Sequence, residues 1–323
     1  MVIDPADRPV AGRDYPRTLQ EFDQWFSSEA ACLDYLRQLR WPEGFLCPVC
    51  NGTAAWPTAR AHLRCTSCQR QTSPIAGTIF EGTRKPLRVW FQAMWYVTNQ
   101  KLGVSALGLQ RVLGLGSYQT AWAWLHKLRR AMVRPGRDRL VRDVEVDETY
   151  IGAREPGVVG RQTEKKAIVA IAAEVDGPRI GRIRLARIND VSAESLGAFV
   201  RASVCEGATV RTDGWHAYND LSSIGYRHRP KNISAGGDPA HVVMPRVHRV
   251  ASLLKRWSLG THQGAIRAAH LDDYLDEFTF RFNRRRARNR GLLFYRLLQQ
   301  ALLADPVPYK RIVHGKRGAK HNL

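Results

Sequence analysis

The chain has 323 residues, enough for two or three domains, and 44% of them are hydrophobic, which is ordinary for a protein with its own core. Its formal charge is +21, and two stretches carry the excess: residues 84–142 and 281–323 each hold twelve Lys or Arg and one acid. Basic stretches beside aromatic residues are typical of nucleic-acid-binding proteins. No apolar run approaches the ~20 residues of a membrane-spanning helix, and residues 1–12 hold no signal-peptide core. We therefore expect a cytoplasmic protein without a membrane partner.

The first 44 residues contain no motif that carries chemistry. Residues 1–17 lack hydrophobic periodicity and are expected to be extended or disordered, whereas residues 18–40 carry apolar side chains at helical spacing. Ser27 or Ser28 is suited to cap the second of two helices. We therefore interpret residues 1–44 as a lead followed by helices.

Four of the six cysteines form two CxxC pairs, with the spacing C-x2-C-x14-C-x2-C. Two such pairs a short hairpin apart can bring four thiolates onto one Zn²⁺ at ~2.3 Å. In a reducing compartment metal binding explains paired cysteines better than disulfides do. We predict a structural zinc ribbon over residues 45–83, and the sequence leaves open whether it contacts DNA or a partner, or only supports the fold. The predicted ligands are Cys47, Cys50, Cys65 and Cys68.

Residues 84–140 are predicted to be a helical, DNA-binding region. A helix over 87–100 is followed by a short helix over 106–113, which Ser105 caps, and after a glycine-containing turn by a helix over 118–130. Two short helices joined by such a turn, the second ending in basic residues, are typical of a helix-turn-helix. The alternative is a helical linker with a solvated basic face. On the helix-turn-helix interpretation, phosphates or bases would be contacted by Gln119, Lys127, Arg129 and Arg130.

The stretch Arg142–Gly152 alternates apolar and polar residues, as a half-buried strand does. Val144 and Val146 fall on one face, and Glu145 and Asp147 on the other. Two carboxylates on one half-buried face are costly unless they hold something positive. A metal ion is the simplest candidate, and a solvated strand face is the alternative.

Two later segments extend this strand into a candidate site. A short β-branched run ends at Asp213-Gly214, which puts a carboxylate at the tip of a strand where the chain turns. Residues 248–257 then carry apolar side chains at the spacing of an amphipathic helix. His248 and Lys255 are seven residues apart and therefore lie two turns apart on one face of that helix.

The intervening elements predict an α/β fold. An apolar run at 168–173 is typical of a strand buried on both faces, and an alternating strand follows it after a turn. With the Asp147 strand these form an antiparallel meander, which a helix and then the Asp213 strand follow. Three strands, a helix, a strand and a later helix is the order of elements in RNase H-like folds. We predict a catalytic domain over residues 141–283 with an RNase H-like mixed sheet flanked by helices, preceded by the zinc ribbon and the helix-turn-helix-like region.

Residues 284–323 form a basic C-terminal tail that begins with the densest run of arginines in the chain. A phosphate-binding arm and a solvated helix both explain such a run, and the character of the rest of the chain favours contact with DNA. The arginines assigned to that contact are Arg284, Arg285 and Arg286.

In this order and spacing, the motifs resemble those of bacterial insertion-sequence transposases of the zinc-ribbon, DDE type. The resemblance covers nearly all of residues 18–300. It rests on the paired cysteines, VDETYIG at 146–152, TDG at 212–214, LKR at 254–256 and YLDEFTFRFN at 274–283. The sequence departs from the family pattern at the third acidic position of the catalytic core, where His248 stands.

The resemblance implies cleavage of DNA strands at the ends of a mobile element and joining of the 3′-hydroxyls to target DNA. This chemistry uses two divalent metal ions, Mg²⁺ with hard oxygen ligands or Mn²⁺ with a nitrogen ligand. By the resemblance Asp147 bridges both ions, Asp213 holds one and His248 completes the other, while Lys255 lies near the scissile phosphate. The expected partners are double-stranded DNA, as element ends and as target, and further copies of the chain on that DNA in the nucleoid.

The third metal ligand has rivals within the sequence, and the alternative for His248 itself is that it only caps the helix or contacts DNA. Asp273, Asp276 and Glu277 are nearby carboxylates, but they come one helix too late for the family pattern. We therefore expect them to shape a helix surface and to pair with neighbouring arginines.

Two other functions share many of these features. One is a DNA-binding regulator with a zinc ribbon and an inactive nuclease fold, against which the intact Asp147 and Asp213 argue. The other is an RNase H-like nuclease without strand transfer, which the sequence does not separate from a transposase.

Overall fold

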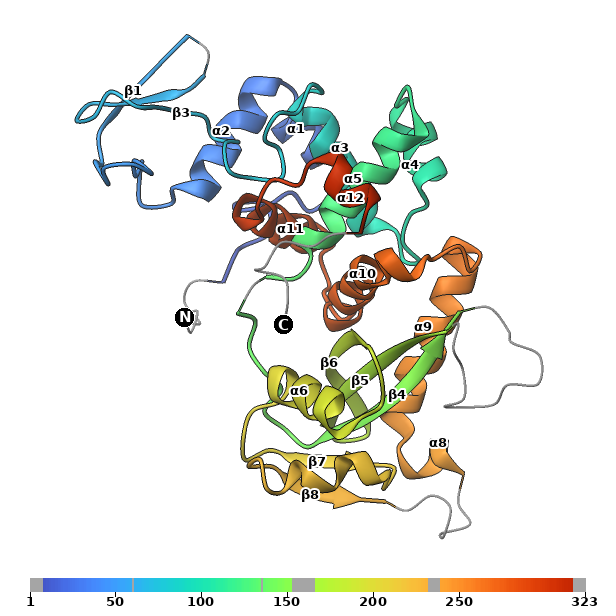
Figure 1. Cartoon of the computed structure of the whole chain (residues 1–323). Coiled ribbons are helices and arrows are strands. Elements are labelled where there is room, and N and C mark those ends of the chain that lie inside the picture. The colour runs from blue at the N-terminus through green and yellow to red at the C-terminus, as the bar shows by residue number, and fades with distance from the viewer. Residues whose placement is uncertain (1–7, 60, 135, 153–165, 232–238, 316–323) are drawn as a thin grey trace. The chain divides into compact units, whose positions relative to one another are not determined.

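The structure, a computed structural model, describes the chain apart from residues 1–7, 60, 135, 153–165, 232–238 and 316–323 (Figure 1). It divides into two units: Met1–Arg134 with Arg286–Ile312, and Pro135–Arg285 with Val313–Leu323. Within the described residues, no helix combines the length and the apolar character needed to cross a bilayer.

Two helices, α1 (Leu19–Trp25) and α2 (Glu29–Arg40), open the first unit. The side chain of Ser28 accepts a hydrogen bond from the amide of Ala31 at 3.2 Å, so Ser28 is the cap of the second helix. The helical prediction for this segment is confirmed, while part of the predicted extended lead, residues 1–7, lies outside the described residues.

A three-stranded antiparallel sheet follows, in the order β1 (Ala55–Pro57), β2 (Leu63–Cys65) and β3 (Gln71–Thr72). Its outer residues are largely exposed, Trp56 among them at 58%. So small a sheet buries too little apolar surface to be stable alone. Its stability must therefore come from another source, and the paired cysteines lie where a metal ion could supply it.

Three helices come next: α3 (Leu87–Asn99), α4 (Ala106–Leu113) and α5 (Tyr118–Ala131). Ser105 and Ser117 cap α4 and α5 by accepting hydrogen bonds from backbone amides at 3.0 and 3.1 Å. The three helices agree with the sequence prediction to within one residue at each end. Two consecutive short helices joined by a tight turn are the arrangement expected of a helix-turn-helix.

The C-terminal segment is not only the basic tail that the sequence suggested. It forms two helices, α11 (Gly291–Leu303) and α12 (Tyr309–Val313). The ring of Phe294 in α11 is fully buried, and its centroid lies 5.5 Å from that of Phe22 and 5.7 Å from that of Phe91. Helix α11 therefore belongs to the aromatic core of the first unit. Its apolar residues recur at helical spacing, so burying them favours a core helix although a run of arginines precedes them.

The second unit is built on a five-stranded sheet in the order β6-β5-β4-β7-β8. Its strands are β4 (Val144–Ile151), β5 (Ala167–Asp176), β6 (Arg179–Ile188), β7 (Thr209–Thr212) and β8 (Arg227–Pro230). The first three form the predicted antiparallel meander, whereas β7 runs parallel to both β4 and β8. The centre of β5 is buried on both faces, which explains its continuous apolar sequence.

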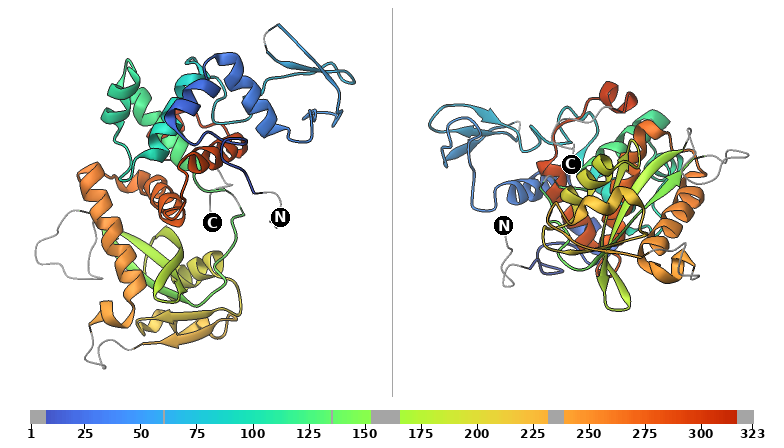
Figure 2. Two further views of the ribbon diagram at one scale, coloured as in Figure 1. Left: turned by 180° about the vertical axis from the view of Figure 1, so that it is seen from behind. Right: turned by 60° about the horizontal axis from the view of Figure 1, so that its bottom comes forward.

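Helices cover both faces of this sheet (Figure 2). One face carries α6 (Ala193–Ser203) and the 3-10 helix η3 (His216–Leu221), and the other carries α9 (Pro245–His262) and α10 (Leu271–Asn283). Two short elements, α8 (Ala240–Val243) and η4 (Ala268–His270), precede α9 and α10. A mixed sheet flanked by helices, with this strand order, is the predicted α/β, RNase H-like fold.

Candidate active site

Strand β4 presents two carboxylates to helix α9, and they differ in what they hold. Glu145, 1% exposed, accepts hydrogen bonds from the amides of Arg246 and Val247 at 2.8 and 3.0 Å. It also pairs with the guanidinium of Arg246 at 2.8 Å. The positive partner of Glu145 is therefore the N-terminus of α9 and its arginine. Of the two carboxylates that were expected to hold a metal ion, Asp147 alone is left as a candidate ligand on this strand.

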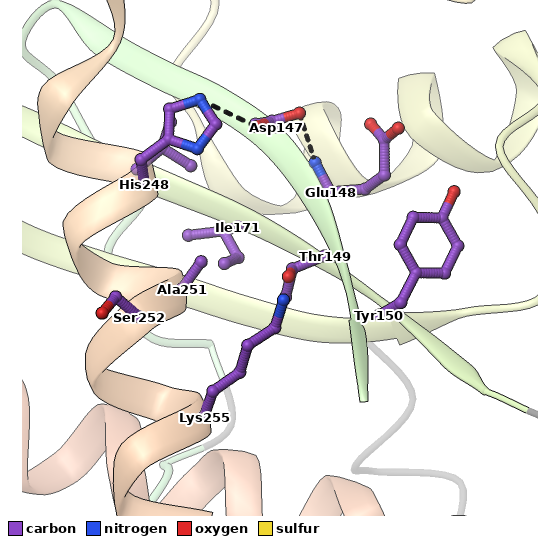
Figure 3. Close-up of a pocket in the computed structure, with 10 residues that line it drawn as sticks. Asp147, Glu148, Thr149, Tyr150, Ile171, His248, Ala251, Ser252 and Lys255 are labelled. Atoms are coloured by element: carbon purple, nitrogen blue, oxygen red, sulfur yellow. Dashed lines mark hydrogen bonds and ion pairs between the residues drawn. The ribbon is translucent and has the colours of Figure 1, made fainter. Parts of the chain in front are cut away.

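Asp147 faces His248 across the space between β4 and α9 (Figure 3). Oδ2 of Asp147 lies 3.7 Å from Nε2 of His248, while Oδ1 accepts a hydrogen bond from the amide of Glu148 at 2.9 Å. The side chains of Asp147 and His248 are 14% and 29% exposed. Among the described residues, Nε2 of His248 is buried and has no hydrogen-bond partner. The imidazole and the carboxylate could together hold a metal ion.

Burial lowers the pKa of His248, because a low-dielectric surrounding disfavours the charged imidazolium. The carboxylates of Glu145 and Asp213 act in the opposite direction, and burial outweighs them. His248 is consequently held neutral, which is the protonation state that ligates metal.

Lys255 shares a pocket with this pair. The pocket has a volume of about 450 Å³, lies between β4 and α9, and is lined by residues that include Asp147, Glu148, Thr149, His248, Ser252 and Lys255. Figure 3 shows the side chain of Lys255 extending from α9 toward the strand at Thr149. The predicted common face of His248 and Lys255, two turns apart on one helix, is therefore present in the structure.

Asp213 follows the last residue of β7, at the strand tip where the sequence puts it. Its Oδ1 accepts a hydrogen bond from the amide of Trp215 at 3.0 Å, which fixes the turn. Asp213 does not line the pocket. Its charge opposes the lowering of the His248 pKa by burial, and it adds, after burial, Glu148 and Asp147, to the raised pKa of Tyr218. Asp213 therefore interacts electrostatically with the site, although it does not line the pocket.

The three rival carboxylates lie on α10 and do not line the pocket. All are buried, so the expectation that they shape a helix surface is wrong. Glu277 pairs with Arg281 at 2.8 Å, as the expected arginine pairing requires.

Two neighbours of the aspartates were not singled out from the sequence. Glu148 lines the pocket and Tyr218, five residues after Asp213, donates a hydrogen bond from its hydroxyl to Oε2 of Glu148 at 3.3 Å. Strand alternation directs Glu148 away from Asp147, and the spacing of Tyr218 from Asp213 spans a turn and an irregular helix. Neither residue therefore has a periodic signal that a sequence pattern reveals.

The four predicted zinc ligands come together in the ribbon. Their sulfur atoms all lie within 4.8 Å of one another, with Cys47 to Cys68 and Cys50 to Cys65 both at 3.6 Å. A tetrahedral Zn²⁺ with bonds of ~2.3 Å requires sulfurs about 3.8 Å apart. Backbone amides directed at the sulfurs lower the pKa of Cys47, and lower that of Cys65 to about 6. The cluster fits Zn²⁺.

The predicted DNA-contacting residues of α5 separate into two groups. Gln119 is exposed near the start of the helix and Lys127 is half-buried, with Nζ 6.0 Å from the ring centroid of Trp90. Arg129 and Arg130 are only 2% and 3% exposed. The expectation that these two arginines face outward is therefore not met, because they follow the core residues of α5 by one helical turn.

The arginine run at the end of α10 is likewise divided in its contacts. Arg284 stacks over Phe280 at 4.1 Å and Arg285 over Phe282 at 3.9 Å. Arg285 also donates hydrogen bonds to carbonyl oxygens of Phe282 and of residues 180 and 181. Arg285 and Arg286 are both exposed, whereas Arg284 is half-buried.

Comparison with known proteins supports the fold and the order of the domains. Residues 139–283 match the model of the ISXO2-like transposase domain, and residues 27–71 match that of the transposase zinc-ribbon domain. The chain is 29% identical over 292 residues to an uncharacterized protein in transposable element ISH50 from Halobacterium salinarum, a match that covers 79% of this chain and 91% of that protein. No solved structure matches. In its two matched domains and their order, the chain is similar to the insertion-sequence transposases of the zinc-ribbon, DDE type.

Proposed function

We propose that the chain is a DNA transposase that cuts the ends of an insertion sequence and joins the resulting 3′-hydroxyls to target DNA. The observation that carries the proposal is the pairing of Asp147 with His248 across the pocket of a transposase domain, with Lys255 on the same face of α9. The carboxylate and the imidazole supply metal ligands, and the lysine supplies a positive charge for a phosphate.

Asp147, Asp213 and His248 would hold divalent cations, Mg²⁺ or Mn²⁺. When bound, such ions activate the attacking water or 3′-hydroxyl and stabilise the leaving oxygen. The buried Nε2 of His248, without a hydrogen-bond partner among the described residues, supports its role as a donor. Two carboxylates suit Mg²⁺, while the nitrogen donor shifts the preference toward Mn²⁺.

Recognition of the element ends is assigned to the first unit. The helices α4 and α5 would enter DNA as a helix-turn-helix, with Gln119 exposed at the start of the second helix. Lys127 and Arg286 would add phosphate contacts, and the zinc ribbon would either join them or contact another protein. Because an element has two ends, we expect several copies of the chain to act together on DNA.

A strand-transfer assay tests the proposal against its rivals. Wild-type protein with duplexes that carry the inverted repeats flanking its reading frame should nick their ends and join them to a plasmid in Mg²⁺ or Mn²⁺. A nuclease would nick without joining, and a regulator would bind without nicking. Absence of inverted repeats around the reading frame would also contradict a transposase.

A further inference from the structure

The backbone ladder between the two aspartate-bearing strands ends before it reaches either aspartate. Strand β4 pairs with β7 only through Val144 with Val210 and Glu145 with Arg211. Asp147 lies two residues beyond this last pair on one strand, and Asp213 lies two residues beyond it on the other. The β4–β5 ladder continues past Asp147 to Ile151 and therefore holds Asp147 from the opposite side. No ladder pair of β4 with β7 therefore joins Asp147 directly to Asp213.

A side-chain hydrogen bond spans this gap. Tyr218 lies in η3, immediately after the Asp213 turn, and its hydroxyl donates to Oε2 of Glu148 at 3.3 Å, a long hydrogen bond. Glu148 is the neighbour of Asp147 and donates its amide to Oδ1 of that residue. At the other end, Oδ1 of Asp213 accepts from the amide of Trp215, the N-cap residue of η3. The hydroxyl therefore links the backbone that carries Asp147 to the backbone that carries Asp213.

The environment of Tyr218 keeps it in this role. The residue is 0% exposed and packs with the core of the second unit beneath α6. Burial, and after it the charges of Glu148, Asp147 and Asp213, raise the pKa of Tyr218 well above its usual value. The hydroxyl accordingly stays protonated and remains a donor. Tight packing in the core also limits the motion of the ring, so its hydroxyl can hold Glu148 in a constant position.

We propose that Tyr218 is a positioning residue, which through Glu148 sets the separation of Asp147 and Asp213 when they hold catalytic metal ions. The inference rests on the proposed function for its metal chemistry. Two ions about 3.5–4 Å apart demand a fixed spacing of the carboxylates between them. Groups that orient metal ligands typically contribute 10–100-fold in affinity or activity.

The chain offers a matched control for this proposal. Tyr226 belongs to the same core cluster, is 5% exposed, and donates its hydroxyl at 3.2 Å to the carbonyl of Val204. Replacing either tyrosine with phenylalanine removes one buried hydroxyl from the same core. The two variants therefore share the cost in folding, and only Tyr218→Phe removes a contact next to the aspartates.

The first measurement is Mn²⁺ binding by full-length protein on an element-end duplex. Binding that Asp147→Asn abolishes is counted as site-specific. The second measurement is the Mn²⁺ dependence of cleavage. Tyr218→Phe should weaken site-specific Mn²⁺ binding roughly tenfold and raise the Mn²⁺ concentration for half-maximal cleavage by a similar factor. Tyr226→Phe should leave both unchanged at a similar melting temperature. The double variant Glu148→Gln, Tyr218→Phe should bind Mn²⁺ no more weakly than the more defective of the two single variants. Both changes break the same hydrogen bond, so their effects should not add.

Equal Mn²⁺ binding by the two tyrosine variants would overturn the inference, and so would a loss confined to Glu148→Gln, which would make Glu148 a direct ligand. The outcomes also separate the two proposals. Wild type that binds Mn²⁺ through Asp147 but cleaves no DNA contradicts the transposase proposal, while a binding defect of Tyr218→Phe in that protein still supports the positioning role.

Discussion

Nε2 of His248 lies 3.7 Å from Oδ2 of Asp147, and the two residues come from a helix and a strand a hundred residues apart in sequence. Glu145 helps to bring them together, because it ties the first turn of α9 to β4 two residues before Asp147. A neutral imidazole thus faces the carboxylate, at the residue that the resemblance assigns to the third catalytic position. Three of the predictions below depend on this relationship.

Replacing His248 tests whether it is the third ligand. His248→Ala should lower the cleavage rate on the order of a hundredfold, since a metal ligand contributes several kcal/mol to the transition state. His248→Glu should keep part of the rate and should shift the preference from Mn²⁺ toward Mg²⁺, because an oxygen donor replaces a nitrogen donor. Cleavage rates in both metals provide the measurement.

Two control variants accompany this series. His314→Ala changes an exposed histidine that follows α12 and does not line the pocket, and it should retain the wild-type rate. Glu277→Ala breaks the pair with Arg281 on α10. A dead Glu277→Ala beside an active His248→Ala would assign the third ligand to α10 instead.

The pH dependence of cleavage should reflect the lowered pKa of His248. Burial holds that pKa below its ordinary 6.5, so as pH falls the imidazole is protonated later than an exposed histidine. Activity in Mn²⁺ should therefore persist at pH 6.5 and decline only at lower pH, and the imidazole resonance of metal-free protein should titrate below 6.5. The same shift opposes folding in acid, because the unfolded chain binds this proton more readily. An NMR midpoint above 6.5 would contradict the burial of His248.

Removing zinc should unfold the ribbon and leave the second unit folded. The small three-stranded sheet depends on the four thiolates, and structural zinc in such modules contributes on the order of 10 kcal/mol. Chelation should abolish amide-exchange protection in residues 47–72 and preserve it in β4 and β5. Cys32→Ser is the control, because this buried cysteine lies outside the cluster and its replacement should leave zinc content unchanged. Retained protection in the ribbon after chelation would show that the thiolates are not needed for its fold.

The helix-turn-helix proposal predicts that two kinds of residue respond differently. Gln119→Ala should reduce the preference for element ends over unrelated DNA roughly tenfold and leave the salt dependence unchanged, as loss of a base contact does. Arg286→Ala should weaken binding to all sequences and reduce the slope of log affinity against log salt by about one. Titrations at several salt concentrations measure both quantities. A truncation without residues 1–142 that still prefers element ends would contradict the assignment.

Local patterns predicted much of this fold. The capping serines 28 and 105, the alternation of β4 and the amphipathic face of α9 depend on neighbours a few residues away, so the sequence reveals them directly. The different partners of Glu145 and Asp147 could not be predicted, because Glu145 pairs with Arg246, a residue distant in sequence. The buried state of Arg129 and the core role of Phe294 depend on tertiary packing, and in both places charge density suggested an exposed surface instead.

The most direct test of the account is cleavage of labelled element-end DNA by Asp147→Asn and Asp213→Asn, with binding measured in parallel by gel shift. Each variant should lose cleavage by at least roughly a thousandfold, because each removes the charge of a metal-holding carboxylate, and each should bind DNA within a few-fold of wild type. Asp220→Asn, an exposed aspartate on η3, is the matched control and should cleave normally. Wild-type cleavage in Mg²⁺ or Mn²⁺ by either site variant would contradict the assigned active site.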